Sequence, residues 1–254
     1  MAAKFRLDGR VALVTGAGRG IGRGVASALG QAGAEVWLLA RTASEIDAVA
    51  AEIRAAGGNA RAVACDVTDA AAVNRVVAGI PLLDVLVNNA GMNIPEPFVA
   101  VSEAHLDQLL NLNVRAMFMV AQAAVRKMLE SPERKTRGGA VINISSQMGH
   151  VGAPMRTVYC LTKHAVEGLT KALAVELAEH NIRVNSIAAT FLDTPMTAPM
   201  LARPEFARWV LERIPMGRVG RVDEVAAAVV FVASEAASLM TGTSLVLDGG
   251  WTAQ

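Results

Sequence analysis

The chain has 254 residues, 53% of them hydrophobic, and its 24 basic and 23 acidic side chains leave a formal net charge of +1. This length suits one α/β domain, and the near-neutral charge excludes the basic footprint of proteins that bind nucleic acid or anionic lipid. Cys65 and Cys160 lack C-x-x-C spacing and no histidine pair has ligand spacing, so we predict reduced thiols and no metal site. Without a signal-peptide core or membrane-length apolar run, we expect a cytoplasmic protein with no membrane partner.

Short β-branched runs alternate with alanine-rich amphipathic segments along the whole chain. Near-continuous apolar strands separated by helix-length segments are typical of a parallel sheet covered on both faces. We therefore predict an α/β fold over residues 1–254, a single doubly wound (Rossmann-type) parallel sheet that binds its ligands at the carboxyl ends of the strands. The predicted strands are 11–15, 35–39, 61–65, 85–88, 141–145, 183–187 and 244–247.

The first predicted strand leads into the glycine-rich loop Thr15-Gly-Ala-Gly-Arg-Gly-Ile-Gly22 and then into an alanine-rich helix. These glycines fit T-G-x-x-x-G-x-G better than the common G-x-G-x-x-G pattern. Glycines let backbone amides approach a diphosphate, and a helix N-terminus favours its negative charge. A tight turn is the alternative, but the strand–loop–helix context favours a dinucleotide, bound by Gly16, Arg19, Gly20, Ile21 and Gly22.

The second predicted strand ends in Leu39-Ala40-Arg41, where enzymes that use NAD usually place a carboxylate for the adenosine ribose. A 2′-phosphate needs a cation instead, and Arg41 and Arg19 supply two. We therefore favour NADP(H) over NAD(H). The alternative is that Arg41 is only a solvated residue before the next helix.

A long segment, 112–128, is apolar on most of its predicted helical circumference. The helix that follows Tyr159 is similarly rich in Ala, Leu and Val. One face of a sheet cannot bury all of this surface. We therefore favour an isologous helix-pair interface between two copies of the chain over a deeply buried helix.

Tyr159 is the only tyrosine in the chain, and Lys163 follows it by four residues. On a helix these positions share a face, so the ammonium should lower the pKa of the phenol from about 10 toward neutrality. The pair would then serve as a general acid or base. The alternative is a structural tyrosine beside a solvated lysine.

The motifs together resemble the short-chain dehydrogenase/reductase family across essentially the whole chain. The resemblance rests on Thr15-Gly16-x-x-x-Gly20-x-Gly22, Asp66, Asn88-Asn89-Ala90-Gly91, Asn113, Ser146 and Tyr159-x-x-x-Lys163. It implies a catalytic tetrad in which Tyr159 donates a proton to a substrate oxygen that Ser146 polarises. Lys163 would lower the pKa of the tyrosine and bind the nicotinamide ribose. Asn113 would bend its helix and hold a water that links the lysine to solvent.

The resemblance also implies further cofactor contacts. Asp66 would accept a hydrogen bond from the adenine amine beside the Val67 backbone, although an ordinary helix N-cap is an alternative. The cofactor would lie over Asn89, Ala90 and Gly91, and Asn88 would brace neighbouring strands. Ala189-Thr190 replaces the family's usual Pro-Gly, and Thr is poorly suited to positive φ, so this loop must differ if the family's glycine has that conformation. Leu192 and Thr194 would lie near the nicotinamide amide.

A lid over residues 190–217 should cover a small carbonyl or alcohol substrate. The similarity extends to 3-oxoacyl-carrier-protein reductases and to gluconate 5-dehydrogenase-like enzymes, and the sequence does not separate them. A non-catalytic NADP-binding redox sensor and an NAD-dependent polyol or sugar-acid dehydrogenase are the alternatives. We expect a homotetramer, or a homodimer. Candidate substrate contacts are Asn93, Gln147, Met148, His150, Arg156 and Phe191, with surface loop filling as the alternative.

Overall fold

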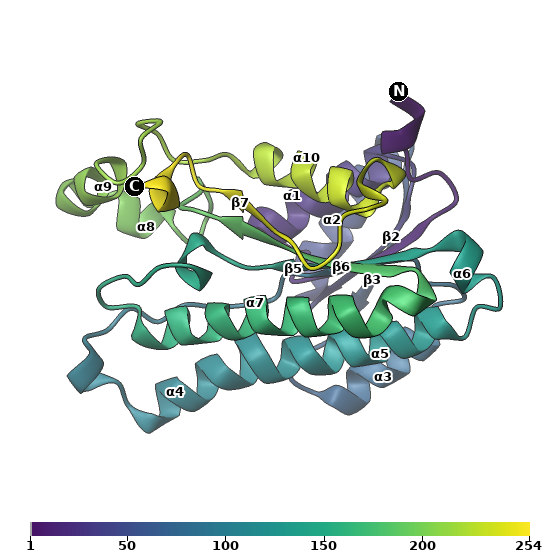
Figure 1. The fold of residues 1–254 in the computed structure, drawn as a ribbon, viewed down its shortest axis with the longest axis horizontal. Coiled ribbons are helices and arrows are strands. Elements are labelled where there is room, and N and C mark those ends of the chain that lie inside the picture. The colour runs from purple at the N-terminus through teal and green to yellow at the C-terminus, as the bar shows by residue number, and fades with distance from the viewer. Residues whose placement is uncertain (1) are drawn as a thin grey trace.

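A computed structural model describes residues 2–254 as a parallel sheet of seven strands with helices on both faces (Figure 1). The strand order is β3-β2-β1-β4-β5-β6-β7. The chain therefore winds outward from β1 in one direction and then, through β4, in the other. This confirms the predicted doubly wound fold, in which β1 and β4 flank the point where the strand order reverses.

The strands are β1 (Val11–Thr15), β2 (Glu35–Ala40), β3 (Asn59–Ala64), β4 (Val85–Asn88), β5 (Gly139–Ile144), β6 (Ile182–Ala189) and β7 (Ser244–Leu247). The helices are α1 (Gly20–Gln31), α2 (Ala43–Ala55), α3 (Ala70–Ala78), α4 (Glu103–Leu110), α5 (Met117–Leu129), α6 (Arg134–Arg137), α7 (Thr157–Leu177), α8 (Ala198–Leu201), α9 (Pro204–Leu211) and α10 (Val222–Ala233). None of them is long and apolar enough to cross a membrane, within residues 2–254.

Alternation along the strands divides the hydrophobic core between the two faces of the sheet. On β1, Ala12 and Val14 pack with α1, α2 and α10, whereas Leu13 packs with α3, α5 and α7. Figure 1 shows the two helical layers, with α10 above the sheet and α3, α5 and α7 below it. Both faces are buried because the crossovers between parallel strands are helical, which explains the near-continuous apolar strands.

The helix predicted over residues 112–128 begins earlier and is not uniform. The segment η3 (Asn111–Ala116) joins α4 to α5 as a π-helical turn, so one continuous helical rod runs from Glu103 to Leu129. A π-helical turn within an α-helix frequently marks a functional site. This turn contains Asn113, where we predicted a bend.

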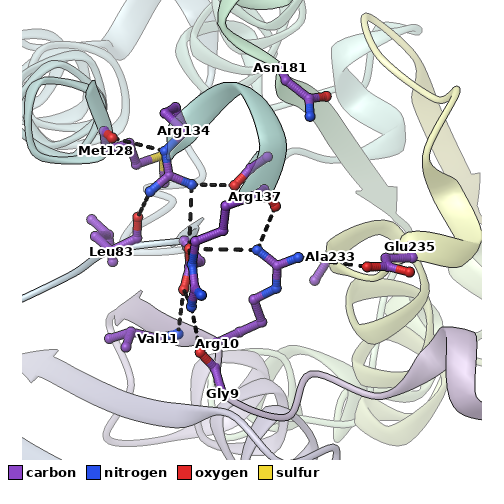
Figure 2. A network of polar contacts seen from close by, with 12 residues as sticks. Gly9, Arg10, Val11, Leu83, Met128, Arg134, Arg137, Asn181, Ala233 and Glu235 are labelled. Atoms are coloured by element: carbon purple, nitrogen blue, oxygen red, sulfur yellow. Dashed lines mark hydrogen bonds and ion pairs between the residues drawn. The ribbon is translucent and has the colours of Figure 1, made fainter. Parts of the chain in front are cut away.

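A buried carboxylate ties the opposite, amino-terminal ends of the strands together (Figure 2). Asp84 is 1% exposed and accepts from Arg137 Nε at 2.6 Å, from Arg134 Nη1 at 3.4 Å and from the Val11 backbone N–H at 3.0 Å. Arg10 approaches it within 3.7 Å. Burial raises the pKa of Asp84, but these donors and charges outweigh burial and hold it below its ordinary value. The network fixes β1, β4 and α6 without any part in the candidate site.

Substitution Asp84→Asn should destabilise the protein by about 3–5 kcal/mol, because it leaves the buried Arg134 guanidinium without a counter-charge. The wild-type contribution is present above the ordinary carboxyl pKa and disappears as the pH falls through the lowered value. Chemical denaturation at several pH values measures both effects. The exposed pair of Arg221 and Asp223 gives the control, since Asp223→Asn should change the unfolding free energy little.

Candidate active site

The loop between β1 and α1 has the geometry that a diphosphate requires. Gly16 and Gly20 have φ values of 63° and 54°, a conformation that favours glycine. A Cβ at Gly22 would lie 2.2 Å from the Gly16 carbonyl oxygen, so no side chain fits there. The first turn of α1 contains no acidic residue and its N-cap, Arg19, makes no side-chain capping bond. The loop and helix N-terminus therefore fit the cofactor's diphosphate.

Thr15 and Asn89 hold this loop against the end of β4. The Thr15 hydroxyl oxygen accepts from the backbone N–H groups of Asn89 and Ala90 at 2.9 and 3.0 Å. The Asn89 amide donates to the carbonyl oxygens of Thr15 and Gly16. Asn88, which we expected to brace neighbouring strands, instead donates to the Met117 carbonyl oxygen of α5 at 2.9 Å. The side chain that links β4 to the β1 loop is thus Asn89.

The end of β2 presents charges of both signs to the loop. Arg41 and Arg19 are exposed, and the charge of Arg41 helps to lower the pKa of Asp66, after its hydrogen bonds from Thr68. A Cβ at Gly18 would lie 2.6 Å from Glu45 Oε2, so this carboxylate lies over the loop. Glu45 was missed from the sequence because it follows the strand end by several residues. Only the turn into α2 brings it back.

Asp66 does not cap a helix. Its Oδ1 accepts from the Thr68 backbone N–H at 2.9 Å and from the Thr68 hydroxyl at 2.8 Å, which forms a local turn. The N-cap of α3 is Asp69, which accepts from the N–H groups of Ala71 and Ala72. The N-cap interpretation of Asp66 was wrong, and its role toward the adenine stays a prediction together with that of the buried Val67.

Asn113 clamps the chain that follows β4. Its Oδ1 accepts from the Met92 N–H at 2.9 Å, and its Nδ2 donates to the Met92 carbonyl oxygen at 2.8 Å and to Thr162 Oγ1 at 3.2 Å. A Cβ at Gly91 would lie 3.2 Å from Asn113 Oδ1. A side chain at Gly91 would therefore crowd Asn113, and the predicted contact of Gly91 with the cofactor stays a prediction. Through this amide, the π-helical turn connects the segment after β4 to α7.

Ser146 follows β5 by two residues and begins a short turn. Its hydroxyl donates to Gln147 Oε1 at 2.8 Å and accepts from the Met148 N–H at 3.1 Å. Ser145 is also buried, and its Oγ has no partner. A Cβ at Gly149 would lie 3.0 Å from Ser145 Oγ and 3.1 Å from Glu167 Cγ, which places Ser145 on the side toward the middle of α7. Gln147 thus orients the Ser146 hydroxyl.

Tyr159 and Lys163 lie one turn apart at the start of α7, as predicted. Lys163 Nζ is 5.5 Å from the centroid of the Tyr159 ring and donates to the Ile144 carbonyl oxygen of β5 at 2.8 Å. Lys163 is 5% exposed, and burial lowers its pKa to about 8, against the opposing charge of Glu167. The lysine is therefore a buried group with one backbone partner rather than a solvated one.

The predicted fall in the pKa of Tyr159 is wrong for the chain on its own. Burial raises this pKa to about 12, and the Ser146 hydroxyl and the charge of Arg156 only partly oppose the rise. The ammonium of Lys163 is directed at Ile144 instead of the phenol oxygen. Desolvation of the phenolate outweighs the neighbouring charges. The phenol is therefore protonated at neutral pH.

The segment after β6 returns to the phosphate loop. A Cβ at Gly20 would lie 3.8 Å from Thr194 Cβ, so Thr194 faces the N-terminus of α1. Leu192 is buried and bridges to Gly220. Thr190 is not among the described residues with positive φ, so the loop accommodates Ala189-Thr190 without a left-handed conformation there. Thr194 thus lies beside the phosphate loop, and the contacts of Leu192 and Thr194 with the nicotinamide stay a prediction.

The candidate substrate residues lie in three kinds of surroundings. Phe191 packs against Phe206 and Trp251, and Met148 is 4% exposed in the same cluster, so both form a hydrophobic wall. His150 is directed to β7, with Nε2 2.9 Å from Ser244 Oγ and 3.5 Å from Glu167 Oε1. Two other groups have no partner, Asn93 Oδ1 and Arg156 Nε. Sequence patterns missed Phe206, Trp209 and Trp251, because the aromatic cluster forms only when α9 and the C-terminal segment meet.

Within residues 2–254, no group of three or more His, Cys, Asp or Glu side chains could hold a metal ion. The fold brings a hydroxyl, a phenol and a buried ammonium together at the carboxyl ends of the strands, beside a loop that fits a diphosphate. A dinucleotide-dependent oxidoreductase is the class of protein that this combination defines.

Comparison with known proteins gives the family. Residues 16–252 match the family described as Enoyl-(Acyl carrier protein) reductase. The chain is 38% identical to L-xylulose reductase of Bos taurus over 98% of its length and 99% of the relative's. It is 39% identical to gluconate 5-dehydrogenase of Gluconobacter oxydans, covering 98% of this chain and 96% of that one.

A solved structure is also similar to this chain. The gluconate 5-dehydrogenase from Burkholderia cenocepacia, in complex with NADP and tartrate, superposes with a TM-score of 0.93 at 34% identity, covering 100% of this chain and 99% of that one. The protein belongs to the short-chain dehydrogenase/reductase family. It is an NAD(P)-dependent oxidoreductase that acts on CH–OH and C=O groups.

Proposed function

We propose that this protein is an NADP(H)-preferring reductase of a small polyhydroxylated ketone, and that Tyr159 is its general acid. The placement of Tyr159, Lys163 and Ser146 around one point supports the assignment of roles. Relatives and structural neighbours named as xylulose and gluconate enzymes support a sugar-like substrate. When bound, the nicotinamide supplies or accepts the hydride.

The roles of the chain's own residues follow from their surroundings. The protonated phenol of Tyr159 donates to the substrate oxygen as that oxygen becomes an alkoxide. Ser146, whose single hydroxyl proton is directed to Gln147 Oε1 in this structure, would turn that proton to the same oxygen and donate a second hydrogen bond to it. Lys163 supplies positive charge next to the developing phenolate and holds a cofactor ribose hydroxyl. Asn113 links the segment after β4 to α7, and within this proposal it would hold the water that the family resemblance implies behind the lysine.

Arg19, Gly20, Ile21 and Gly22 would hold the diphosphate, and Arg41 the 2′-phosphate. The preference for NADP(H) is supported by the exposed cations Arg19 and Arg41 near the loop, although the carboxylates of Glu45 and Asp66 lie close by. Structural neighbours with NADP bound also support it. The remaining adenine and nicotinamide contacts, Asp66, Val67, Leu192 and Thr194, keep their predicted roles within this proposal.

The preference is tested by measuring kcat/KM with NADPH and with NADH on a panel of ketones. Substitution Arg41→Ala should lower the value for NADPH about 10- to 100-fold and leave that for NADH nearly unchanged, because a charged hydrogen bond contributes about 1.5–3 kcal/mol. Glu45→Gln is the matched control and should not lower the NADPH value. A wild-type kcat/KM that is higher with NADH would refute the assignment.

We also propose a homotetramer located in the cytoplasm. Exposed apolar side chains on α5 and α7, Phe118, Leu161 and Val175, support a helix-pair interface, and the 99% exposed Leu239 near β7 supports a second one. Two free cysteines, Cys65 and Cys160, are compatible with a reducing compartment. A purely monomeric mass in solution would contradict the assembly.

A further inference from the structure

Arg156 is a buried cation without a counter-charge. Its residue is 5% exposed, its Nε has no hydrogen-bond partner, and no carboxylate of the described residues pairs with it. Nη1 donates to the carbonyl oxygen of the adjacent Met155 at 3.1 Å, and Nη2 approaches Met200 Sδ at 3.4 Å. A thioether is a weak acceptor. A buried charge without a partner destabilises the folded state.

Arg156 follows a residue with strained backbone and lies between the segment after β4 and helix α8. Met155 has a φ of 59°, which is unusual for a residue with a side chain. Its carbonyl oxygen accepts from the Glu96 backbone N–H at 3.1 Å, so the chain after β4 meets the start of α7 at this point. Met200 belongs to α8, the first helix of the expected lid. The guanidinium thus lies between α7 and the lid.

The same guanidinium acts on the catalytic residue. Arg156 precedes Tyr159 by three residues as the N-cap of α7, but its side chain makes no capping bond. Its charge lowers the pKa of Tyr159, which places it within electrostatic reach of the phenol. Burial lowers the pKa of Arg156 itself. A guanidinium nevertheless keeps its charge in proteins at neutral pH.

A complementary group lies on the neighbouring segment. Asn93 Oδ1, on the chain that reaches Met155 through Glu96, is a buried acceptor without a donor. Arg156 therefore offers an unsatisfied charged donor between α7 and the lid, and Asn93 offers an unsatisfied acceptor on the segment that contacts Met155 through Glu96. Together they match a ligand that carries both a negative charge and a hydroxyl group.

We propose that Arg156 binds the carboxylate of the substrate and that the enzyme reduces a hydroxylated keto acid in preference to a neutral ketose. Asn93 accepts a hydrogen bond from a substrate hydroxyl. This inference rests on the proposed function, and it selects the acid among the sugar-like substrates. A planar guanidinium suits a carboxylate because it can present two N–H groups in parallel.

The test compares two substrates that differ only at one carbon, a six-carbon keto-aldonate and the ketose in which CH₂OH replaces the carboxylate. Wild-type kcat/KM should be about 10- to 150-fold higher for the acid, since a hydrogen bond to a charged group contributes about 1.5–3 kcal/mol. In Arg156→Gln this ratio should fall to about 1. Arg75→Gln is the matched control: Arg75 is an exposed arginine of α3, which packs against α5, and its loss should preserve the ratio.

A binding measurement separates this inference from the proposed function. Calorimetric titration of the aldonate into the enzyme–NADPH complex, which cannot react further, should show binding in the wild type that Arg156→Gln abolishes. Equal kcat/KM for acid and ketose in the wild type would overturn the inference and leave the reductase assignment intact. Turnover of neither substrate would refute the proposed function, and the titration would then decide the inference alone. If Arg156→Gln fails to fold, the wild-type ratio decides it.

Discussion

Tyr159→Phe should lose at least 10²- to 10⁴-fold in kcat for ketone reduction, which is about the contribution of a positioned general acid. The substitution removes only the hydroxyl and keeps the ring in its partly buried place against the aromatic cluster and below the Lys163 ammonium. Folding and NADPH affinity should therefore change little. Steady-state turnover, NADPH titration and thermal unfolding of the same preparation measure the three quantities.

The raised pKa of Tyr159 also predicts which direction of the reaction is faster at neutral pH. With the pKa of Tyr159 at about 12, the phenol is protonated from neutral pH upward to that value. Reduction needs the protonated form and oxidation the deprotonated form, so reduction should be the faster direction at neutral pH, and oxidation should increase as the pH rises. A Phe variant with turnover within a factor of about ten of the wild type would remove Tyr159 from the chemistry.

Periodicity and motif order were sufficient for the fold. Strands such as β1 and β5 are apolar on both sides, and their alternation with helix-length segments fixed the parallel sheet. Strand ends were less accurate: β3 begins at Asn59 instead of residue 61, and β6 extends to Ala189. Hydrogen bonding to the neighbouring strands decides such ends, and local sequence carries little of that information.

The site was predictable where spacing along one element fixes the geometry. Lys163 and Tyr159 share a helical turn, and glycines at fixed offsets define the loop. Prediction failed where a side chain had two possible partners in other elements. Asn88 binds α5 and Asn89 binds the loop after β1. The sequence alone does not distinguish the partners of two adjacent asparagines. The predicted direction of the Tyr159 pKa shift was wrong for a related reason. The i, i+4 spacing indicates that Lys163 is near, but not how deeply Tyr159 is buried or where the ammonium points.

Lys163→Met should lower kcat at least about 100-fold, because a preorganised charge near developing negative charge contributes about that much. It should also weaken NADPH binding, unlike Tyr159→Phe, since the same ammonium is proposed to hold a ribose hydroxyl. Methionine is an apolar side chain of similar length, so it can replace the buried stem of Lys163. A parallel titration of both variants with NADPH therefore distinguishes the charge from the phenol.

The pH profile gives the more specific result. Lys163 faces Tyr159 and Glu167 on its own helix and the Ile144 carbonyl of β5, and Glu167 in turn lies 3.5 Å from His150. Since burial lowers the pKa of Lys163 to about 8, the ammonium is present below that pH and lost above it. Reduction should therefore decline as the pH rises through about 8, while Lys163→Arg, whose charge does not titrate there, should lose this decline. If the decline persists unchanged in Lys163→Arg, another group causes it. The variant His150→Gln then tests whether that group is His150, which lies beside Glu167.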